Sequence, residues 1–487
     1  MSLNVLFVVS EVEGFAKTGG LADVGYALPK ALAEIGHNVV VVMPRYYVID
    51  KNTLEHIPIS SDVLLGESTL RFGAFKSKLL DSDVDIYFVD YEAFFGRKGL
   101  YDDGFVAYHD NAERFIFFSK AALELSKSIG FKPDIVHLND WQTAAAGVVL
   151  RHDDYFRDSA VVLTIHNLQH QGFFDKQKFG LLNVDWSHFN PFEFEALGGL
   201  NLLKGGIALA DAITTVSKKY SQEIQTPQFG FGLHEHIKAH SFKLFGILNG
   251  VDYKQWNPKT DRFIKSNYDI DSLENKQRCK EELVSIFNLS LNDNTPLIGF
   301  IGRLVKQKGI ELLAASIEDV LKRLDVGFVL LGAGELWAEQ FFSNIAARFR
   351  DRFGCFIGYS YELAHKIEAG CDMFLMPSLF EPCGLNQIYS LRYATLPIVR
   401  AVGGLDDTVK NYDTKTGEGW GFKFWDATPK ALFDTVKWAI SVFKENKKDF
   451  TAMQKRAMQL RFDWKNSAKN YVDVYSWARI YKRLKNG

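Results

Sequence analysis

Short runs of β-branched and other apolar residues alternate along the chain with longer segments whose apolar residues recur at helical spacing. In the first half, this pattern predicts strands at 5–10, 38–43, 134–138, 161–165 and 212–216 and a helix at 20–35. After residue 250 it restarts, with strands at 297–301, 327–331 and 373–376 and helices at 310–323 and 340–350. Continuous apolar strands between helices are typical of parallel sheets covered on both faces. We therefore predict two consecutive doubly wound α/β domains.

The segment 247–258 (ILNGVDYKQWNP) carries Gly, Asn and Pro and is typical of an interdomain crossing. Aromatic residues near helical spacing over 464–484 predict a closing helix. The predicted domains are therefore 1–248, 249–463 and a C-terminal helix, 464–487, that packs back toward the first domain. Ligands of such sheets bind at the carboxyl ends of the strands, so we expect a catalytic cleft between the two domains.

Composition and charge narrow the class of protein. The 487 residues are 47% hydrophobic and 24% charged, an ordinary globular composition. A net charge of -2 argues against a non-specific partner such as nucleic acid or an anionic membrane. The apolar runs are far shorter than the ~18 residues of a membrane span, and the N-terminal segment lacks the basic stretch of a signal peptide. The four cysteines show no CxxC spacing, so we expect a cytoplasmic protein with reduced thiols.

A glycine pair precedes the first predicted helix, in the sequence EGFAKTGG. Backbone amides at a helix start, together with the helix dipole, favour an anion, and Lys17 adds a positive charge beside Gly19 and Gly20. The loop is neither a P-loop nor a dinucleotide-binding motif. A tight turn that needs glycine explains the same residues, so both interpretations stay open.

Two further loops follow strands of the second domain. Arg303 and Lys308, in FIGRLVKQKG, bracket a turn before a helix and suit a pyrophosphate, although a solvated basic turn is the alternative. Glu381 stands among Phe, Pro, Cys and Gly and is a candidate buried carboxylate. Cys383 has no neighbouring His in the sequence, which favours a packed thiol over a nucleophile.

Asp140 and His166 follow two predicted strands of the first domain, and we expect both to point into the cleft. A single His after a strand is often structural, so each residue alone carries little weight. No His, Cys or Asp cluster shows the spacing of metal ligands, and we predict that there is no metal site.

The motifs gain specificity when they are taken together. In chain order they are KTGGLADV (17–24), DW (140–141), TIHN (164–167), ILNGVD (247–252), GRL (302–304), QKG (307–309), FEPCGL (380–385) and GGL (403–405). This series resembles the bacterial glycogen synthases and plant starch synthases, over about residues 3 to 480.

The resemblance implies a two-domain glycosyltransferase fold of the B type with the two Rossmann-like domains facing a central cleft. It implies transfer of glucose from a nucleotide-sugar, usually ADP-glucose, to the non-reducing end of an α-1,4-glucan such as glycogen. The anomeric configuration is retained, and neither a metal nor another cofactor is expected. No nucleic acid or membrane partner is implied, and the sequence leaves the oligomeric state open.

The resemblance also assigns roles, with Arg303 and Lys308 on the diphosphate and Glu381 on the donor glucose. The implied catalytic residues are Glu381, His166, Asp140, Lys308 and Arg303; the donor-binding residues are Lys17, Gly19, Gly20, Arg303, Lys308, Tyr359, Gly384, Leu385 and Asn386; the sugar- and acceptor-side residues are Asp23, Tyr101, Asn249 and Cys383. Tyr359 is expected to pack on the nucleobase.

The chain departs from the family pattern at several positions. Leu379 replaces a basic residue, Asn386 a threonine and Ala394 a glycine, and Tyr389 stands where many related transferases carry a second Glu. Two other functions remain open: a related retaining transferase with a small acceptor, and a catalytically silent glucan-binding protein. The aromatic segment 173–200 favours a polymer synthase over a transferase with a small acceptor. The presence of Lys17, Arg303 and Lys308 argues against a silent glucan-binding protein, which would not need cations for a diphosphate.

Overall fold

The computed structural model describes residues 2–104 and 106–486. It divides into two compact units: unit 1 runs to Gly250 and resumes at Trp464, and unit 2 is Val251–Asp463. The sequence-based boundaries lie at 248/249 and 463/464. Residues 1, 105 and 487, which fall within the predicted domains, lie outside the described residues.

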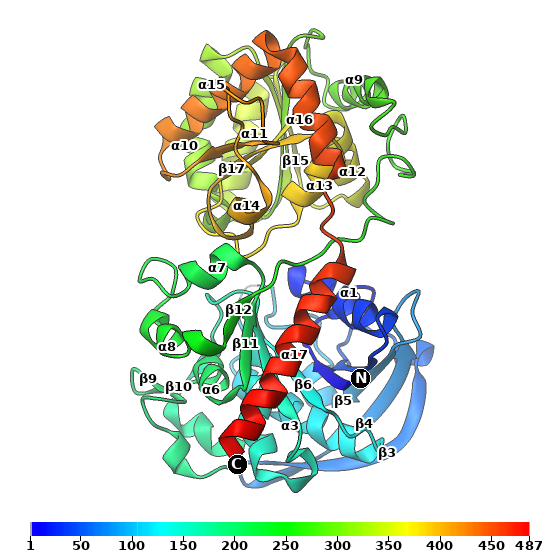
Figure 1. The fold of residues 1–487 in the computed structure, drawn as a ribbon, viewed down its shortest axis with the longest axis vertical. Helices are drawn as coiled ribbons and strands as arrows, with labels where there is room; N and C mark the ends of the chain where they lie inside the picture. Colours follow the sequence, from blue (N-terminus) through cyan, green and yellow to red (C-terminus); the bar gives the residue numbers. More distant parts are fainter. Residues whose placement is uncertain (1, 105, 487) are drawn as a thin grey trace. The chain divides into compact units, whose positions relative to one another are not determined.

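Within its described residues, unit 1 contains a nine-stranded sheet in the order β12-β11-β7-β6-β1-β2-β5-β4-β3 (Figure 1). The strands from β12 to β5 are parallel, whereas β4 and β3 continue the sheet antiparallel. The strands are β1 (Asn4–Val8), β2 (Asn38–Pro44), β3 (Glu55–Leu65), β4 (Ser68–Lys78), β5 (Asp85–Asp90), β6 (Ile135–Asn139), β7 (Ala160–Ile165), β11 (Ala212–Thr215) and β12 (Leu244–Gly246).

Helices and a small second sheet complete unit 1. The small sheet, also within the described residues, comprises β8 (Phe173–Phe174), β10 (Gly199–Asn201) and β9 (Glu195–Ala196) in that order. The helices are α1 (Gly20–Glu34), α2 (Glu92–Phe95), α3 (Asn111–Ser128), α4 (Trp141–Ala144), α5 (Ala146–Val149), α6 (Leu202–Leu209), α7 (Lys218–Glu223), α8 (His234–Ala239) and α17 (Trp464–Asn486). The long α17, red in Figure 1, packs against α1, β7 and β11, so the end of the chain belongs to unit 1.

Unit 2, all of whose residues are described, is built on a six-stranded parallel sheet in the order β15-β14-β13-β16-β17-β18. The strands are β13 (Leu297–Ile301), β14 (Gly327–Gly332), β15 (Phe353–Ile357), β16 (Met373–Met376), β17 (Leu396–Arg400) and β18 (Phe422–Phe424). The helices are α9 (Lys276–Ile286), α10 (Ile310–Arg323), α11 (Leu336–Arg348), α12 (Tyr361–Gly370), α13 (Asn386–Arg392), α14 (Gly403–Thr408), α15 (Pro429–Glu445) and α16 (Lys447–Gln459). This strand order is that of a Rossmann fold.

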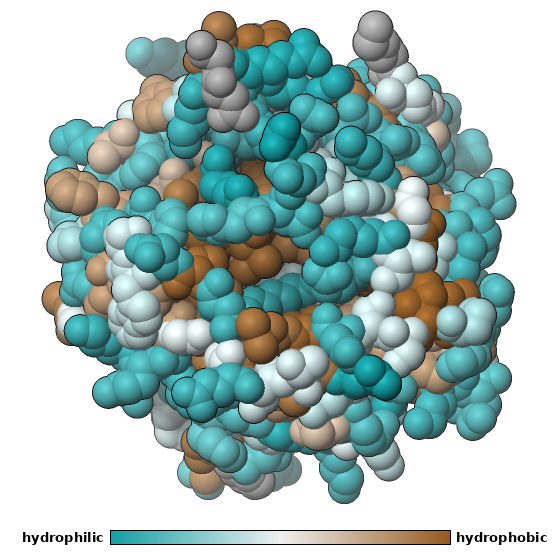
Figure 2. Space-filling view, turned by 90° about the horizontal axis from the view of Figure 1, so that it is seen from below, coloured by the Kyte–Doolittle hydropathy of each residue, from teal (hydrophilic) through white to brown (hydrophobic). Residues whose placement is uncertain are grey.

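The predicted fold class, two doubly wound α/β domains, is confirmed. The predicted helix at 340–350 begins earlier, at Leu336, and ends at Arg348. The antiparallel extension of the unit 1 sheet by β3 and β4 was not predicted. The face shown in Figure 2 is largely hydrophilic, with hydrophobic residues gathered near its middle. No helix in the described part of the chain is long and apolar enough to cross a membrane.

A buried polar contact ties α17 to the sheet of unit 1. His137, on β6, is fully buried; its Nδ1 lies 2.7 Å from the Tyr475 hydroxyl of α17, and its Nε2 lies 2.6 Å from Thr164 Oγ1. Burial lowers the pKa of His137 to about 3, so the imidazole is neutral and both ring nitrogens have a partner. The contact replaces water at two buried polar groups and thereby fixes the position of the closing helix.

Tyr475→Phe removes only the hydroxyl and leaves the buried His137 Nδ1 without its partner. We expect a loss of about 1–3 kcal/mol in the free energy of unfolding, measured by denaturant titration. Tyr481→Phe is the control, because Tyr481 lies on the same helix and contributes by stacking its ring on Trp477. An equal effect of the two substitutions would contradict this account.

Candidate active site

In unit 1, two of the predicted site residues meet at the carboxyl edge of the sheet. β7, β6 and β1 are parallel neighbours, and the strand order reverses between β6 and β1, which is where doubly wound sheets bind ligands. Asp140 follows β6 and His166 follows β7. The carboxylate Oδ1 of Asp140 accepts a hydrogen bond of 2.7 Å from the backbone N–H of His166. The strand ends therefore bring together two residues that lie far apart in the sequence.

Burial sets the protonation states of this pair. Asp140 is buried with φ 55° and ψ −172°, a combination that residues other than glycine rarely adopt. Burial raises the pKa of Asp140 to about 7, against hydrogen bonds from the His166 and Asn167 backbone that lower it. Burial lowers the pKa of His166 to about 3. At neutral pH the imidazole is therefore uncharged, and Asp140 is close to the midpoint of its titration.

Asn139 fixes the tautomer of His166. Its Nδ2 donates to the Val8 carbonyl at 3.0 Å, which leaves its Oδ1 2.9 Å from His166 Nε2. Because an amide oxygen only accepts hydrogen bonds, Nε2 of His166 carries the proton. Its Nδ1 is then the unprotonated nitrogen, which can accept a hydrogen bond from a hydroxyl group.

Glu11, after β1, is a site residue that the sequence analysis missed. Its carboxylate accepts hydrogen bonds from the Thr18 amide (2.5 Å), the Thr18 hydroxyl (2.7 Å) and the Gly19 amide (3.2 Å). The Tyr101 hydroxyl donates to the same carboxylate at 2.7 Å. Two amides of the glycine-rich loop therefore already hold a negative charge supplied by the chain. An acid directly after the first predicted strand was the signal for it.

The outer side of the glycine-rich loop is open. Gly19 has an extended backbone (φ −158°), and a Cβ added at Gly19 or Gly20 would meet no atom within 4 Å. Neither the local conformation nor packing against the described residues requires glycine there, and the missing side chains leave room for a ligand to approach the backbone closely. Lys17, in the same loop, pairs with Glu13 (2.6 Å) and with Asp23 (2.9 Å), a predicted acceptor-side residue.

In unit 2, the predicted cation and carboxylate meet at the other switch point. Lys308 follows β13, Glu381 follows β16, and the strand order reverses between these two strands. Lys308 Nζ lies 2.6 Å from Glu381 Oε2, and the Ser378 hydroxyl donates to the same oxygen at 3.0 Å. Arg303 is exposed, with Nη2 3.5 Å from Gln307 Oε1. The sequence motifs predict different roles for Lys308 and Glu381, on the diphosphate and on the donor glucose, but do not predict that the two side chains contact each other.

Two glycines allow this arrangement. Gly309, with φ 72°, directly precedes α10, and a Cβ there would lie 2.0 Å from the Pro377 carbonyl oxygen. Gly403, with φ 45°, begins α14, and a Cβ there would lie 1.9 Å from the Glu381 carbonyl oxygen. Both positions combine the left-handed region with a backbone contact. They let the Lys308 turn and α14 approach the loop that carries Glu381.

The remaining predicted donor residues follow β15 and β16. Tyr359 is 86% exposed, so its ring has a free face. Asn386 Nδ2 donates to the Ile301 carbonyl at 2.9 Å, which ties α13 to the end of β13. Leu385 precedes α13, and Gly384 has φ 71°. Cys383 is buried, as expected of a packed thiol.

Tyr389, at the position of the second Glu of related transferases, takes part in packing. Its ring stacks on Trp256 (4.1 Å between centroids), which in turn stacks on the buried His365 at 3.8 Å. His365 Nδ1 lies 2.7 Å from Asp261 Oδ2. This column joins the first segment of unit 2 to α12 and α13.

Asn249, predicted near the sugar, is buried, and its Oδ1 has no hydrogen-bond partner among the described residues. A buried polar atom without a partner is costly unless a ligand satisfies it. Among residues 2–104 and 106–486, no group of three or more His, Cys, Asp or Glu side chains is placed to hold a metal ion.

Comparison with known proteins shows which family this chain belongs to. Residues 4–239 match the starch synthase catalytic domain, and residues 283–448 match the glycosyl transferases group 1 family. Glycogen synthase 1 of Geobacter sulfurreducens is 48% identical, over 99% of this chain and 97% of its own. Glycogen synthase of Koribacter versatilis is 43% identical, over 98% of each chain. This chain belongs to the glycogen and starch synthase family of glycosyltransferases.

Solved structures agree with this family assignment. The catalytic domain of starch synthase IV from Arabidopsis thaliana, bound to ADP and acarbose, superimposes with a TM-score of 0.89 at 32% identity, covering 98% of this chain and all of that one. A sucrose-phosphate synthase from Thermosynechococcus elongatus, 16% identical with a TM-score of 0.60 over 97% of this chain and 98% of its own, shares the fold. The predicted family and the B-type fold are thus confirmed.

The buried Asp140 should give this synthase a characteristic pH dependence. Its folded-state pKa of about 7 lies above the ordinary 3.8, so the folded state is progressively penalised as the pH rises from about 4 to 7. Asp140→Asn keeps an acceptor oxygen and removes the charge. We expect the variant to gain roughly 1–3 kcal/mol of stability relative to the original protein on going from pH 5 to pH 8.

Denaturant unfolding of both proteins at the two pH values measures this gain. Asp158→Asn, at a side chain that is 83% exposed, is the control and should show no such change. A stability difference between Asp140→Asn and the original protein that is independent of pH would contradict the assignment.

Proposed function

We propose that this chain transfers glucose from ADP-glucose to the non-reducing end of an α-1,4-glucan such as glycogen, with retention of configuration, in the cytoplasm and without a metal or other cofactor. The observation that carries the proposal is the cluster at the β13/β16 switch point, where Lys308 and Glu381 contact each other and Arg303 is nearby in sequence and exposed. In a chain of this family, that cluster suits a nucleoside diphosphate sugar.

The two cations suit the leaving group. Negative charge grows on the diphosphate as the glycosyl bond breaks, and fixed positive charges nearby stabilise the transition state. Lys308 already has an anionic partner in Glu381. A diphosphate would therefore compete for, or share, an ammonium group that is held in place in advance, and the exposed Arg303 can form bidentate bonds to phosphate oxygens. These cations supply charge of the kind that a divalent metal would otherwise provide.

Glu381 suits the sugar rather than the phosphate. Within the described residues, its contacts with Lys308 and Ser378 both fall on Oε2, which leaves Oε1 to accept from a hydroxyl group of the glucose. The carboxylate is buried, so a hydrogen bond to it is strengthened by the low dielectric.

Unit 1 suits the saccharide side of the reaction. His166 offers its unprotonated Nδ1, and Asp140 offers a carboxyl group that is close to the midpoint of its titration at neutral pH. Asn249 offers a buried Oδ1 that has no hydrogen-bond partner among the described residues. Hydroxyl groups of a sugar can donate to all three.

The first test is an initial-rate assay of the purified protein on glycogen with ADP-glucose or UDP-glucose, with and without EDTA. We expect ADP-glucose to be preferred and chelation to leave the rate unchanged, because Arg303 and Lys308 can supply positive charge to the leaving diphosphate. Strict dependence on Mg²⁺ or Mn²⁺ would exclude the metal-free proposal. Transfer to a monosaccharide phosphate but not to glycogen would indicate a small-acceptor enzyme, and no transfer at all a silent glucan-binding protein.

The second test separates the roles of Lys308 and Glu381. Lys308→Ala should weaken ADP binding about ten- to a hundredfold, because a charge-assisted contact to phosphate is lost. Glu381→Gln should lower kcat strongly while ADP binds at least as tightly, because Lys308 loses its competing carboxylate. Lys306→Ala, at an exposed lysine of the same turn, is the matched control and should change neither quantity much.

Calorimetry with ADP and kcat measurements on each variant provide the comparison. If Glu381→Gln loses ADP affinity as severely as Lys308→Ala while both remain folded, the division of roles is wrong.

A further inference from the structure

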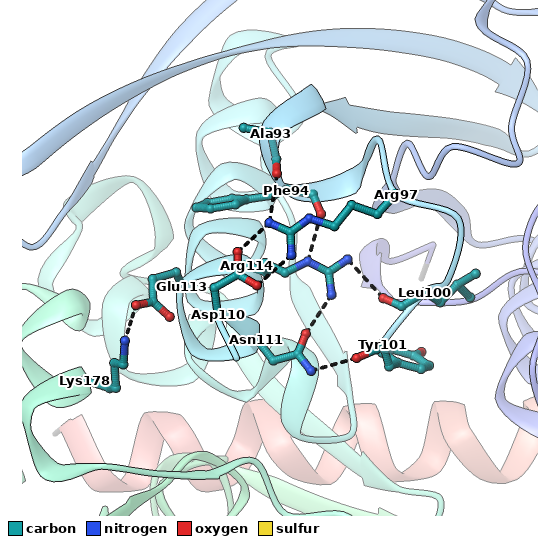
Figure 3. Close-up of polar contacts among 10 residues, drawn as sticks. All are labelled: Ala93, Phe94, Arg97, Leu100, Tyr101, Asp110, Asn111, Glu113, Arg114 and Lys178. Carbon is teal, nitrogen blue, oxygen red and sulfur yellow. Dashed lines mark hydrogen bonds and ion pairs between the residues drawn. The ribbon is translucent and has the colours of Figure 1, made fainter. Parts of the chain in front are cut away.

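Arg114 is a fully buried cation whose hydrogen bonds go to neutral oxygens. On α3, its Nε donates to the Phe94 carbonyl (2.8 Å), its Nη1 to Asn111 Oδ1 (2.6 Å) and its Nη2 to the Leu100 carbonyl (3.0 Å), as Figure 3 shows. Burial lowers its pKa. Among the described residues no carboxylate is bonded to this guanidinium, which lies 5.4, 4.8 and 5.2 Å from the ring centroids of Phe95, Tyr108 and Phe115. Burying a cation without an anionic partner is costly, so the segments that its three hydrogen bonds hold deserve a closer look.

Those three bonds hold the loop that carries Tyr101. Asn111, oriented by Arg114, donates through Nδ2 to the Tyr101 carbonyl at 2.9 Å (Figure 3). A second arginine, Arg97, makes a bidentate pair with Asp110 at 2.7 and 2.6 Å. The segment between α2 and α3 is thus fixed near both ends by guanidinium groups.

Tyr101 connects this ordered segment to Glu11 by a hydrogen bond. Its hydroxyl donates to Glu11 Oε1 at 2.7 Å, and the Ser10 hydroxyl lies 2.7 Å from the same oxygen of Tyr101. Burial raises the pKa of Tyr101 well above its usual value, so the hydroxyl keeps its proton and remains a donor. Glu11 in turn holds the amides of Thr18 and Gly19. A continuous chain of hydrogen bonds therefore runs from Arg114 to the glycine-rich loop.

We propose that Arg114 and Tyr101 are positioning residues for the synthase reaction, acting through Glu11 to hold the glycine-rich loop in the conformation that receives the donor. The roles of Arg114 and Tyr101 in the reaction rest on the proposed function. Their effect on the order of the glycine-rich loop does not depend on it. A loop that is ordered before binding avoids the entropy cost of ordering it with the substrate. The open space outside Gly19 and Gly20 is then kept available. This role for Tyr101 differs from direct contact with the acceptor.

The first measurement is independent of the function. Tyr101→Phe removes one hydroxyl and keeps the ring, so the protein should stay folded. We expect the amides of Thr18 and Gly19 to exchange hydrogen about tenfold faster or more in this variant without substrate, because a charge-assisted bond to their acceptor is lost. Tyr108→Phe, in the same loop, is the matched control and should leave exchange unchanged.

The second measurement is kinetic. A preorganised loop contributes equally to ground-state and transition-state binding, so Tyr101→Phe should raise KM for the nucleotide-sugar about tenfold while kcat stays within about twofold. Arg114→Lys cannot reproduce the three-way contact and should raise the same KM. In the Tyr101→Phe background, Arg114→Lys should have little further effect on that KM, because both residues act through the same hydroxyl.

Unchanged exchange at Thr18 and Gly19 in Tyr101→Phe would overturn the proposal, whatever the protein's activity. A rise in KM confined to the glucan would assign Tyr101 to direct acceptor contact and would also overturn it. If Arg114→Lys does not fold, Asn111→Ala replaces it in the same cycle, and additive effects with Tyr101→Phe would count against the relay. If exchange rises but no glucosyl transfer is found with any donor, the positioning chain stands and the proposed function fails.

Discussion

Parallel sheets covered by helices leave one edge, where the strands end, for polar side chains to gather. Both units obey this constraint, and in each the candidate site lies where the strand order reverses. Glu11, Asp140 and His166 follow β1, β6 and β7 in unit 1, while Lys308 and Glu381 follow β13 and β16 in unit 2. Residues from distant parts of the chain meet there because parallel strands end at the same edge.

Several charged groups of these two sites already have partners within the chain. Glu11 holds amides of the glycine-rich loop, Lys17 pairs with two carboxylates, and Lys308 pairs with Glu381. Under the proposed function, a substrate that binds there would replace these internal partners rather than neutralise isolated charges. Such internal partners lower the affinity for the substrate, because they compete with it for the same charged groups. They also fix the geometry of the site, because each charged group is already oriented before the substrate binds.

Much of the fold could be predicted because buried parallel strands are continuous apolar runs. β13 and β16 have the predicted bounds, and β6 and β7 differ from them by single residues. The extension by β3 and β4 was missed, although Gly66 and Glu67 form a two-residue turn between them and the exposure of β3 alternates along the strand. A strand with one solvated face shows alternating polar and apolar residues, and this pattern is weaker than the continuous apolar runs that mark the buried parallel strands.

The candidate site also contains residues that the sequence predicts and residues that only the structure reveals. Lys308, Glu381, Asp140 and His166 were predicted because they follow strands within recognisable motifs. Glu11 and Arg114 were missed because their importance lies in contacts across the fold, such as the bond between Tyr101 and Glu11, which are 90 residues apart. The contact of Lys308 with Glu381, 73 residues apart, likewise requires β13 and β16 to be neighbours.

If ADP replaces Glu381 as the partner of Lys308, the two side chains must be coupled in ADP binding, and a double-mutant cycle on ADP affinity measures that coupling. Calorimetry would compare Glu381→Gln in the original background and in the Lys308→Ala background, at one ionic strength. We expect Glu381→Gln to maintain or raise ADP affinity when Lys308 is present. We expect its effect on ADP affinity to be less favourable in the Lys308→Ala background, so that the two substitutions are coupled. Equal effects of Glu381→Gln in the two backgrounds would show that the pair plays no part in binding and would contradict the account.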